Sequence, residues 1–250
     1  MRTNAGALVR AFLSGYLPNY FNNSKSLNLR CFGMSYLAEK VSYHIFNAIR
    51  KTMPLILLIK YSLLNAFKFR NELFQIIEQT DHKLQLIDVD PNVLIKNEIK
   101  KILILDFDGV MAAHGKKRPD RSVIKWLKEA IECFDQKNIF ILSNALTKER
   151  KTYFLNNYPE IHLIDATKKK PYPDGILQIL EIAKCKPDEA IIIDDRILTG
   201  ILAGHIAGIK TIYISNPLAD ISNNLGDELF FAVVRRLEKY FIRIMVKINV

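Results

Sequence analysis

The sequence predicts an α/β protein, a parallel β-sheet with helices on both faces. Short, continuously apolar runs alternate with amphipathic stretches, and the hydrophobic content of 49% is enough for a buried core. The expected strands are Ile102–Phe107, Ile139–Leu142, Ile161–Ile164, Ala190–Ile193 and Thr211–Ile214. The expected helices are Arg121–Gln136, Thr147–Asn157, Asp174–Lys184, Ile197–Ala207 and Asp227–Tyr240.

The first part of the chain differs in charge from the rest, which predicts a segment at residues 1–83 ahead of an α/β domain at residues 84–250. Residues 1–70 contain ten Lys or Arg and one acidic residue, Glu39, and so carry +9 of the net charge of +10. Apolar residues recur at helical spacing between Leu37 and Ile49, which predicts a helical extension. Because Lys60 interrupts the apolar run that begins at Met53, we do not expect a membrane-spanning helix.

Three interpretations of this segment stay open. It packs its apolar faces on itself or on the main domain, it lies on an anionic membrane surface, or its acid-free first 38 residues are an organelle transit peptide. No nucleic-acid-binding module is recognisable, so no nucleic-acid partner is expected. Three widely spaced cysteines form neither a disulfide framework nor a zinc site, which favours the cytoplasm or an organelle matrix.

A pair of acidic residues marks the end of the first expected strand. Asp106 and Asp108 flank Phe107, and alternation along a strand points their carboxylates to the same side. Neighbouring carboxylates repel each other unless a cation joins them. The pair predicts either a divalent-metal site in which one carboxylate is also a nucleophile, or a strand-end turn capped by Asp.

The next three strands end in residues that suit phosphate chemistry. Ser143 and Asn144 follow the second strand, where a hydroxyl binds phosphate or caps a helix. Lys170 follows the third strand, where it neutralises a bound phosphate or belongs to a solvated basic loop. Asp194 and Asp195 follow the fourth strand and need a metal or a basic partner. Because parallel strands end at one edge of the sheet, the combination predicts a phosphoryl-transfer site.

These residues resemble the motifs of the haloacid dehalogenase (HAD) superfamily. The four segments that carry the resemblance are Leu105-Asp106-Phe107-Asp108-Gly109-Val110, Leu142-Ser143-Asn144, Lys170-Pro171 and Ile193-Asp194-Asp195. The lead-in Ile87-Asp88-Val89-Asp90-Pro91 and the late Arg235-Arg236-Leu237-Glu238 are similar to the YqeG-type, subclass IIIA members. That group includes the mitochondrial and plastid phosphatidylglycerophosphate phosphatases. The resemblance covers residues 84–240 and implies a HAD-type, Rossmann-like phosphatase that depends on Mg²⁺.

The resemblance also implies a role for each site residue. Asp106 is the expected nucleophile, and Asp108 is the expected general acid and then base. The implied phosphate-binding residues are Ser143, Asn144 and Lys170. The implied Mg²⁺ ligands are Asp106, Asp108 through its backbone carbonyl, and Asp195 with Asp194 as neighbour or alternative.

Two features bear on the metal and on the substrate. Arg196 and Gly200 stand where the YqeG-type pattern has Gln and a second Asp, so Asp194 is the candidate replacement for the missing carboxylate. Arg196 is unexplained unless it contacts an anionic substrate. The segments Met111–Arg121 and Asn144–Lys170 are too short to hold a cap domain, so an open site that accepts large substrates is expected.

The leading hypothesis is an Mg²⁺-dependent phosphomonoesterase that acts on phosphatidylglycerophosphate, as a peripheral protein on the inner face of a membrane. One alternative keeps the chemistry and makes the substrate a soluble sugar phosphate, nucleotide or phosphoprotein. Another is an inactive HAD fold that binds a membrane or a partner. Hydrolysis and liposome binding, measured separately, distinguish the three.

Overall fold

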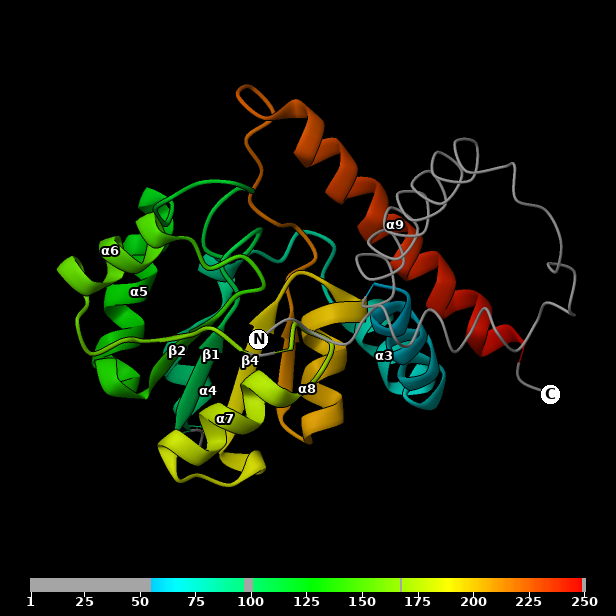
Figure 1. Cartoon of the computed structure of the whole chain (residues 1–250), viewed down its shortest axis with the longest axis horizontal. Coiled ribbons are helices and arrows are strands. Elements are labelled where there is room, and N and C mark those ends of the chain that lie inside the picture. The colour runs from blue at the N-terminus through cyan, green and yellow to red at the C-terminus, as the bar shows by residue number, and fades with distance from the viewer. Residues whose placement is uncertain (1–54, 97–100, 167, 249–250) are drawn as a thin grey trace, which may run out of the picture. The chain divides into compact units, whose positions relative to one another are not determined.

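Five strands form one parallel sheet in the order β3-β2-β1-β4-β5 (Figure 1). The computed structural model describes residues 55–96, 101–166 and 168–248. The strands are β1 (Ile102–Leu105), β2 (Ile139–Leu142), β3 (His162–Ile164), β4 (Ala190–Asp194) and β5 (Lys210–Tyr213). Each lies where a strand was expected, and their parallel pairing confirms the predicted α/β fold.

Helices cover both faces of the sheet, because the strands are apolar on both sides (Figure 1). Leu103 and Leu105 of β1 pack in one core with the helices α4 (Pro91–Lys96), α5 (Arg121–Phe134) and α6 (Lys148–Asn157). Ile102 and Ile104 face the opposite core with α7 (Asp174–Ala183) and α8 (Leu202–Ala207). Short 3₁₀ turns lie at η1 (Leu86–Asp88), η2 (Gln136–Asn138) and η3 (Pro187–Glu189). Alternate β1 side chains thus anchor two helical layers.

A third apolar cluster lies beside β5. It joins α3 (Arg70–Gln79) and α9 (Leu225–Lys247) to the sheet through Leu73, Tyr213 and Ile242. The helical residues 55–68 contribute Ala66 to this cluster and hydrogen-bond the sheet unit, Ser62 Oγ donating to the Leu198 carbonyl at 3.0 Å.

Residues Ile56–Val250 form one compact unit, so residues 56–83, assigned above to the amino-terminal segment, pack with the sheet. The predictions for residues 1–54, a helical extension, a membrane-surface segment or a transit peptide, fall outside the described residues. None of the helices in the described part of the chain is both long enough and apolar enough to cross a membrane.

The chain segments that border the carboxyl edge of the sheet are short. Residues 109–120 contain no helix and no regular strand, only turns and an isolated bridge between Asp108 and Ala112. A single helix, α6, connects β2 to β3. Within the described segments, therefore, no inserted domain stands over this edge.

Candidate active site

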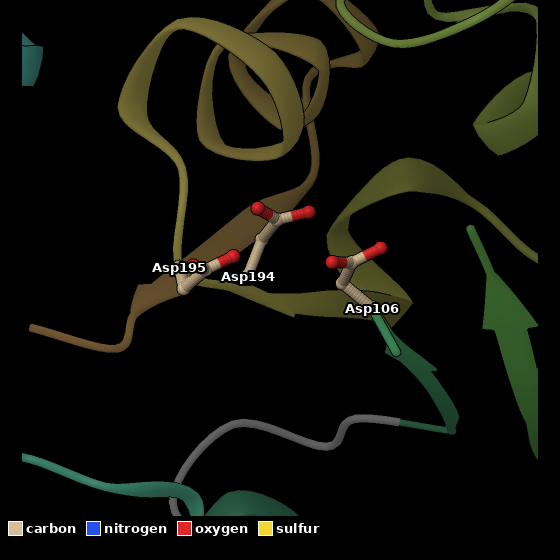
Figure 2. Close-up of side chains that lie close together, drawn as sticks. All are labelled: Asp106, Asp194 and Asp195. Carbon is tan, nitrogen blue, oxygen red and sulfur yellow. The ribbon is translucent and has the colours of Figure 1, made fainter. Parts of the chain in front are cut away.

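Three buried carboxylates meet at the carboxyl edge of the sheet. Asp106 directly follows β1, while Asp194 ends the neighbouring strand β4 and Asp195 comes next in the chain. Carboxylate oxygens of the three residues lie within 4.8 Å of one another (Figure 2). The exposed fractions of the residues are 7%, 0% and 1%, so little solvent screens their mutual repulsion. Such a cluster needs compensating positive charge.

Lys170 supplies part of that charge from the loop between β3 and α7. Its Nζ donates to Asp106 Oδ1 at 2.7 Å and to Asp194 Oδ2 at 2.5 Å, and only 4% of the residue is exposed. Asn144 fixes the backbone of the lysine: its Oδ1 accepts from Lys170 N at 2.9 Å, and its Nδ2 donates to the Lys170 carbonyl at 3.3 Å. Asn144, expected at the phosphate, thus holds Lys170 in this structure.

Arg235, from α9, supplies a second cation. Its Nε donates to Asp195 Oδ2 at 2.6 Å, and both side chains are buried. When all three carboxylates are ionised, Lys170 and Arg235 together balance two of them, which leaves one negative charge in excess. Among the described residues, the other Asp195 oxygen, Oδ1, is buried without a hydrogen-bond partner. A desolvated oxygen of this kind is costly unless a ligand meets it.

The protonation of the cluster reflects this imbalance. Burial raises the pKa of Asp106 to about 8, with Asp194 and Asp195 adding to the rise and Lys170 opposing it. Burial likewise raises the pKa of Asp195 to about 7, against the opposing effect of Arg235. Burial alone would lower the pKa of Lys170, but Asp106 and Asp194 outweigh it and raise that pKa. The site therefore favours an additional cation.

These residues fit a magnesium ion. Mg²⁺ prefers carboxylate oxygens and usually binds through a small number of them. The cluster offers three such groups, an unpartnered Asp195 oxygen and an excess of negative charge. Asp108 contributes no carboxylate oxygen to this cluster, and the role expected for its backbone carbonyl stays a prediction.

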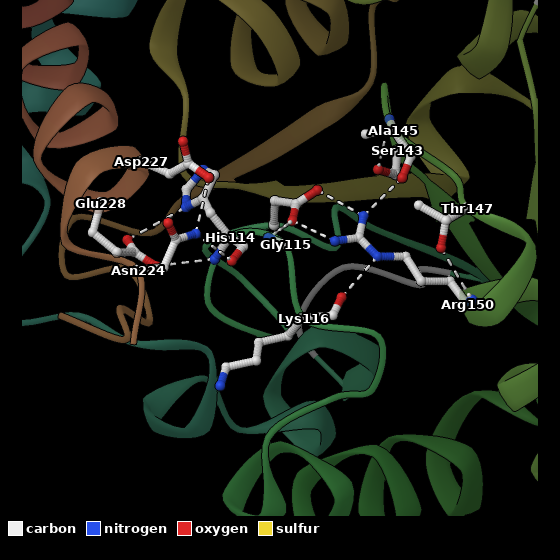
Figure 3. A network of polar contacts seen from close by, with 11 residues as sticks. His114, Gly115, Lys116, Ser143, Ala145, Thr147, Arg150, Asn224, Asp227 and Glu228 are labelled. Atoms are coloured by element: carbon white, nitrogen blue, oxygen red, sulfur yellow. Dashed lines mark hydrogen bonds and ion pairs between the residues drawn. The ribbon is translucent and has the colours of Figure 1, made fainter. Parts of the chain in front are cut away.

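The Asp108 carboxylate is instead held by Arg150 of α6. The guanidinium donates from Nη2 to Oδ1 at 2.6 Å and from Nη1 to Oδ2 at 2.8 Å. The same arginine donates to the carbonyls of Lys116 and Ala145 (Figure 3). Its guanidinium lies 4.0 Å from the centre of the Phe107 ring. Such bidentate pairs fix orientation as well as charge. Asp108 therefore has a defined position beside Asp106.

Sequence reasoning missed Arg150. It lies near the start of α6, whose amino acids are mostly polar, and it is one of only two residues of that helix that are buried. Nothing in the local pattern distinguishes it from Lys148 and Lys151 beside it, neither of which is buried. Its partner is 42 residues away in the chain, so tertiary packing alone reveals the contact.

Ser143 directly follows β2 and is 6% exposed at the same edge. Its Oγ accepts a hydrogen bond from Ala145 N at 3.1 Å, which stabilises the turn leading to α6 (Figure 3). This is the turn-capping role that the sequence left open. A serine hydroxyl can accept this bond and still donate its own proton, so the phosphate-binding role stays a prediction.

The two departures from the YqeG-type pattern have structural explanations. Arg196 donates to Glu238 of α9 from Nε at 2.9 Å, and it does not stand free to contact a substrate. The expected helix at residues 197–207 begins as a π-helix, η4 (Ile197–Ile201), before α8. Gly200 lies in this π-turn, and a Cβ there would overlap the carboxylate of Asp194. Glycine at position 200 thus makes room for Asp194.

A hollow of about 690 Å³ opens beside the Asp108 loop. Four basic residues are among those that line it: Lys116, Lys117, Arg118 and Arg121. One of its lining residues is linked to the site, because the Lys116 carbonyl accepts the hydrogen bond from Arg150 Nε at 3.0 Å. Lys116 is paired with Asp220 and Lys117 with Glu149. Asp120 and Asp220 also line the hollow, so its four basic residues outnumber its acidic ones by two and give it a modest positive character.

Comparisons with solved structures show limited likeness. A protein from Listeria monocytogenes serotype 4b has 16% identity and a TM-score of 0.38, over 45% of this chain and 77% of that one. A HAD-superfamily hydrolase, subfamily IA, variant 1, from Geobacter sulfurreducens has 16% identity and a TM-score of 0.31, over 46% and 89%. The phosphatase-domain part of BF1531 from Bacteroides fragilis, complexed with Mg, has 17% identity and a TM-score of 0.34, over 93% and 70%. With TM-scores this low, none of the three supports an assignment.

Comparison with curated proteins finds no match. The family described as mitochondrial PGP phosphatase does match, over residues 65–219. That span is well over half of the 250 residues and contains each of the predicted site residues from Asp106 to Asp195. The predicted relationship to the PGP phosphatases is thereby confirmed: the chain belongs to the mitochondrial PGP phosphatase family and is a phosphatase.

Proposed function

We propose that this phosphatase hydrolyses phosphatidylglycerophosphate at a membrane surface, with Mg²⁺ as cofactor and through a phosphoryl group carried on Asp106. The observation that carries the chemical part is the placement of Lys170. Its Nζ bridges Asp106 at 2.7 Å and Asp194 at 2.5 Å, at the edge of the sheet where Asp195 also lies. A nucleophilic carboxylate next to a fixed cation suits attack on a phosphate.

The metal ligands in this proposal are Asp106, Asp194 and Asp195, together with the backbone carbonyl of Asp108. When bound, Mg²⁺ supplies charge neutralisation, so that an anionic phosphate can approach a carboxylate. Arg235 holds Asp195 in place through a 2.6 Å hydrogen bond from Nε to Oδ2. Gly200 leaves the space that the Asp194 side chain occupies.

The chain's own residues divide the reaction into two displacements. A carboxylate oxygen of Asp106 bonds to phosphorus while the bond from phosphorus to the alcohol oxygen breaks, and Asp108 gives that oxygen its proton. Asp108 then takes a proton from water, whose oxygen bonds to phosphorus as the bond to Asp106 breaks. Inorganic phosphate and the free Asp106 carboxylate result. Throughout, Lys170 stays beside Asp106 to balance charge.

Arg150 and Ser143 prepare the site for these steps. Arg150 holds the ionised Asp108 carboxylate by two hydrogen bonds, which fixes its position once it has given up its proton. In the proposed mechanism Asp108 leaves this pair when it carries the proton. The Ser143 hydroxyl, held in its turn by Ala145 N, donates its proton to a phosphoryl oxygen.

Three features support a lipid substrate with a second phosphate. The described segments around the site leave it uncapped, so a headgroup that projects from a membrane can enter. The basic hollow of about 690 Å³ beside the Asp108 loop suits a further anionic group. The family description names PGP, and we extend that substrate to this chain.

The experiment that tests this proposal measures phosphate release from micellar phosphatidylglycerophosphate and from a soluble aryl phosphate, with and without Mg²⁺. Wild type is compared with Asp106→Asn and with the matched control Asp90→Asn, an exposed aspartate outside the site. We expect release from the lipid to require both Mg²⁺ and Asp106, and Asp90→Asn to behave as wild type.

Each alternative gives a different result. If phosphate is released from the aryl phosphate and from soluble phosphoesters at least as fast as from the lipid, the substrate would be a soluble phosphoester and not the lipid. Release that persists in Asp106→Asn would remove Asp106 as nucleophile. A folded wild-type chain that binds liposomes and Mg²⁺ but turns over no phosphoester would be a binding module.

A further inference from the structure

Helix α9 buries charged side chains and exposes apolar ones, which is the opposite of an ordinary surface helix. Of its four buried residues, three are charged: Glu228, Arg235 and Glu238. It exposes large apolar or aromatic side chains at six positions, with exposed fractions between 47% and 65%: Leu225, Leu229, Phe230, Val233, Leu237 and Tyr240. A surface helix normally presents polar side chains to water and apolar ones to the core.

The buried charged face of α9 holds three segments of the active site. Glu228 Oε1 accepts from His114 N at 3.0 Å, in the loop that follows Asp108 (Figure 3). Arg235 Nε donates to Asp195 at 2.6 Å. Glu238 accepts from Ile197 N at 3.1 Å and from Arg196, at the start of the π-turn. The position of α9 thus bears directly on a proposed metal ligand.

The exposed apolar face of α9 continues onto the helical residues 55–68. A groove of about 470 Å³ lies between them, lined by Leu63 on one side and by Leu237 and Phe241 of α9 on the other. Beyond the groove, the shorter helical stretch exposes Ile59, Leu64 and Phe67 as well. These side chains place exposed apolar groups on both sides of the groove, and together they form the apolar surface of α9 and residues 55–68.

Charge indicates what covers this surface. Arg236, Lys239, Arg243 and Lys247 recur at helical spacing along α9, next to the apolar stripe. Arg243 is also paired with Glu78 of α3, and Lys239 lies over the Tyr213 ring. Lys60 and Lys68 are exposed on the shorter helical stretch. An apolar stripe with aromatic members and a basic border is typical of helices that lie in the interface of an anionic bilayer. A second protein chain would not require this basic border.

We propose that the apolar face of α9 and residues 55–68 docks on an anionic bilayer, and that docking fixes the charged face of α9 against the active site. The inference rests on the proposed function for its substrate but concerns a different surface. On the bilayer, burial of the apolar stripe stabilises α9. Arg235 is then held on Asp195 and Glu238 on the π-turn, and the site is completed where its lipid substrate lies.

The test uses the full chain and vesicles of phosphatidylglycerol, which is anionic and carries no phosphomonoester. Wild type is compared with Leu229→Gln/Leu237→Gln, and with the matched control Leu177→Gln/Ile182→Gln on α7, whose leucine and isoleucine are 50% and 46% exposed. Three quantities are measured: binding to the vesicles, hydrogen exchange of the amides of residues 225–240, and hydrolysis of a soluble aryl phosphate with and without vesicles.

We expect wild type and the α7 control to bind these vesicles, and to bind phosphatidylcholine vesicles far more weakly. Binding should slow amide exchange in α9 and raise the aryl phosphatase rate at least about threefold, because α9 is fixed on the site. The affinity of the α9 variant for the vesicles should be at least about tenfold lower than that of wild type. Vesicles should not raise its aryl phosphatase rate, and its rate without vesicles should equal that of wild type.

Four outcomes would overturn the inference. In the first, the α9 variant binds phosphatidylglycerol vesicles as well as wild type. In the second, wild type binds without change in α9 exchange or in aryl phosphatase rate. In the third, vesicles have no effect and wild type self-associates while the α9 variant does not, which would show that a second copy of the chain covers this face. In the fourth, vesicles have no effect and protease cleaves residues 1–54 faster in the α9 variant than in wild type, which would show that residues 1–54 cover this face.

The proposed function is tested separately from the docking surface. Asp106→Asn keeps α9 and its contacts, so it should bind vesicles and show slower α9 exchange even though it hydrolyses nothing. A wild type that docks in this way without phosphatase turnover would refute the catalytic proposal and leave the docking face intact.

Discussion

Gly200 packs directly against Asp194, and no side-chain atom at position 200 fits beside that carboxylate. The contact arises because η4 winds as a π-helix and brings its backbone close to the end of β4. The carboxylate that the YqeG-type pattern carries at the later position is therefore excluded here for as long as Asp194 keeps its place.

Substitution of Gly200 by alanine should damage both folding and catalysis, because its Cβ would displace Asp194 from Lys170. We expect a loss of about 1–3 kcal/mol in the free energy of unfolding and at least a tenfold loss of phosphatase rate. Gly226→Ala is the control, since a Cβ there would meet no atom within 4 Å. A Gly200→Ala enzyme with wild-type stability and rate would contradict this account of the π-turn.

The Asp108–Arg150 pair predicts a second effect. Arg150→Ala leaves a carboxylate that is only 19% exposed without its partner, so the free energy of unfolding should fall by about 3 kcal/mol. The phosphatase rate should fall about tenfold or more, with Arg150→Lys restoring part of it. Lys151→Ala, which breaks the neighbouring exposed pair with Asp165, should change stability by about 0.5 kcal/mol or less. Equal effects of the two alanine variants would refute the prediction.

The convergence of Asp106, Lys170 and Asp194 was predictable from the sequence. In a parallel sheet the carboxyl ends of the strands share one edge, and apolar runs located those ends to within two residues. The two helical layers follow from the same apolar runs, whereas the strand order is known from the structure alone.

The residues that position this cluster were not predictable from local patterns. Arg150, Glu228 and Arg235 lie on helices, and which face of a helix turns inward is set by tertiary packing. On α9 three of the four buried residues are charged, so the periodicity of apolar residues, which predicted the helix, does not identify its buried face. The π-turn at Gly200 has no local signature and depends on the Asp194 side chain that it accommodates.

Magnesium binding should depend on pH. The pKa of Asp106 is raised to about 8 and that of Asp195 to about 7 in the metal-free site. Folding therefore takes up protons, and the stability that this contributes is present at low pH and lost as pH rises through about 8. Mg²⁺ needs the ionised carboxylates, so its apparent affinity should rise at least about tenfold between pH 6 and pH 8.

The measurement is the increase in melting temperature on addition of Mg²⁺, taken across this pH range. The increase should be small at the acid end and large at the alkaline end, and it should shrink at every pH in Asp195→Asn. A shift of the same size at all pH values would contradict ionisation of these carboxylates on metal binding.

The basic hollow should contribute to the binding of phosphatidylglycerophosphate but not to that of the aryl phosphate. Arg118→Ala/Arg121→Ala should raise KM for phosphatidylglycerophosphate about fivefold or more and leave kcat unchanged, because it removes binding shared by ground state and transition state. The aryl phosphate has no second anionic group, so its kinetic constants should not change. Lys125→Ala, an exposed change on α5 outside the hollow, is the control. Equal increases of KM for both substrates would show that the hollow does not bind the second phosphate of the headgroup.

The central claim is that the phosphoryl group passes through Asp106. Wild type and Asp108→Asn are mixed with substrate and Mg²⁺, quenched in acid within one turnover, and their peptides are mapped by mass spectrometry. We predict one phosphoryl group on Asp106, present longer in Asp108→Asn because the residue that activates water is missing. Product formation without any phosphoryl group on Asp106, or with the group on another residue, would contradict the account.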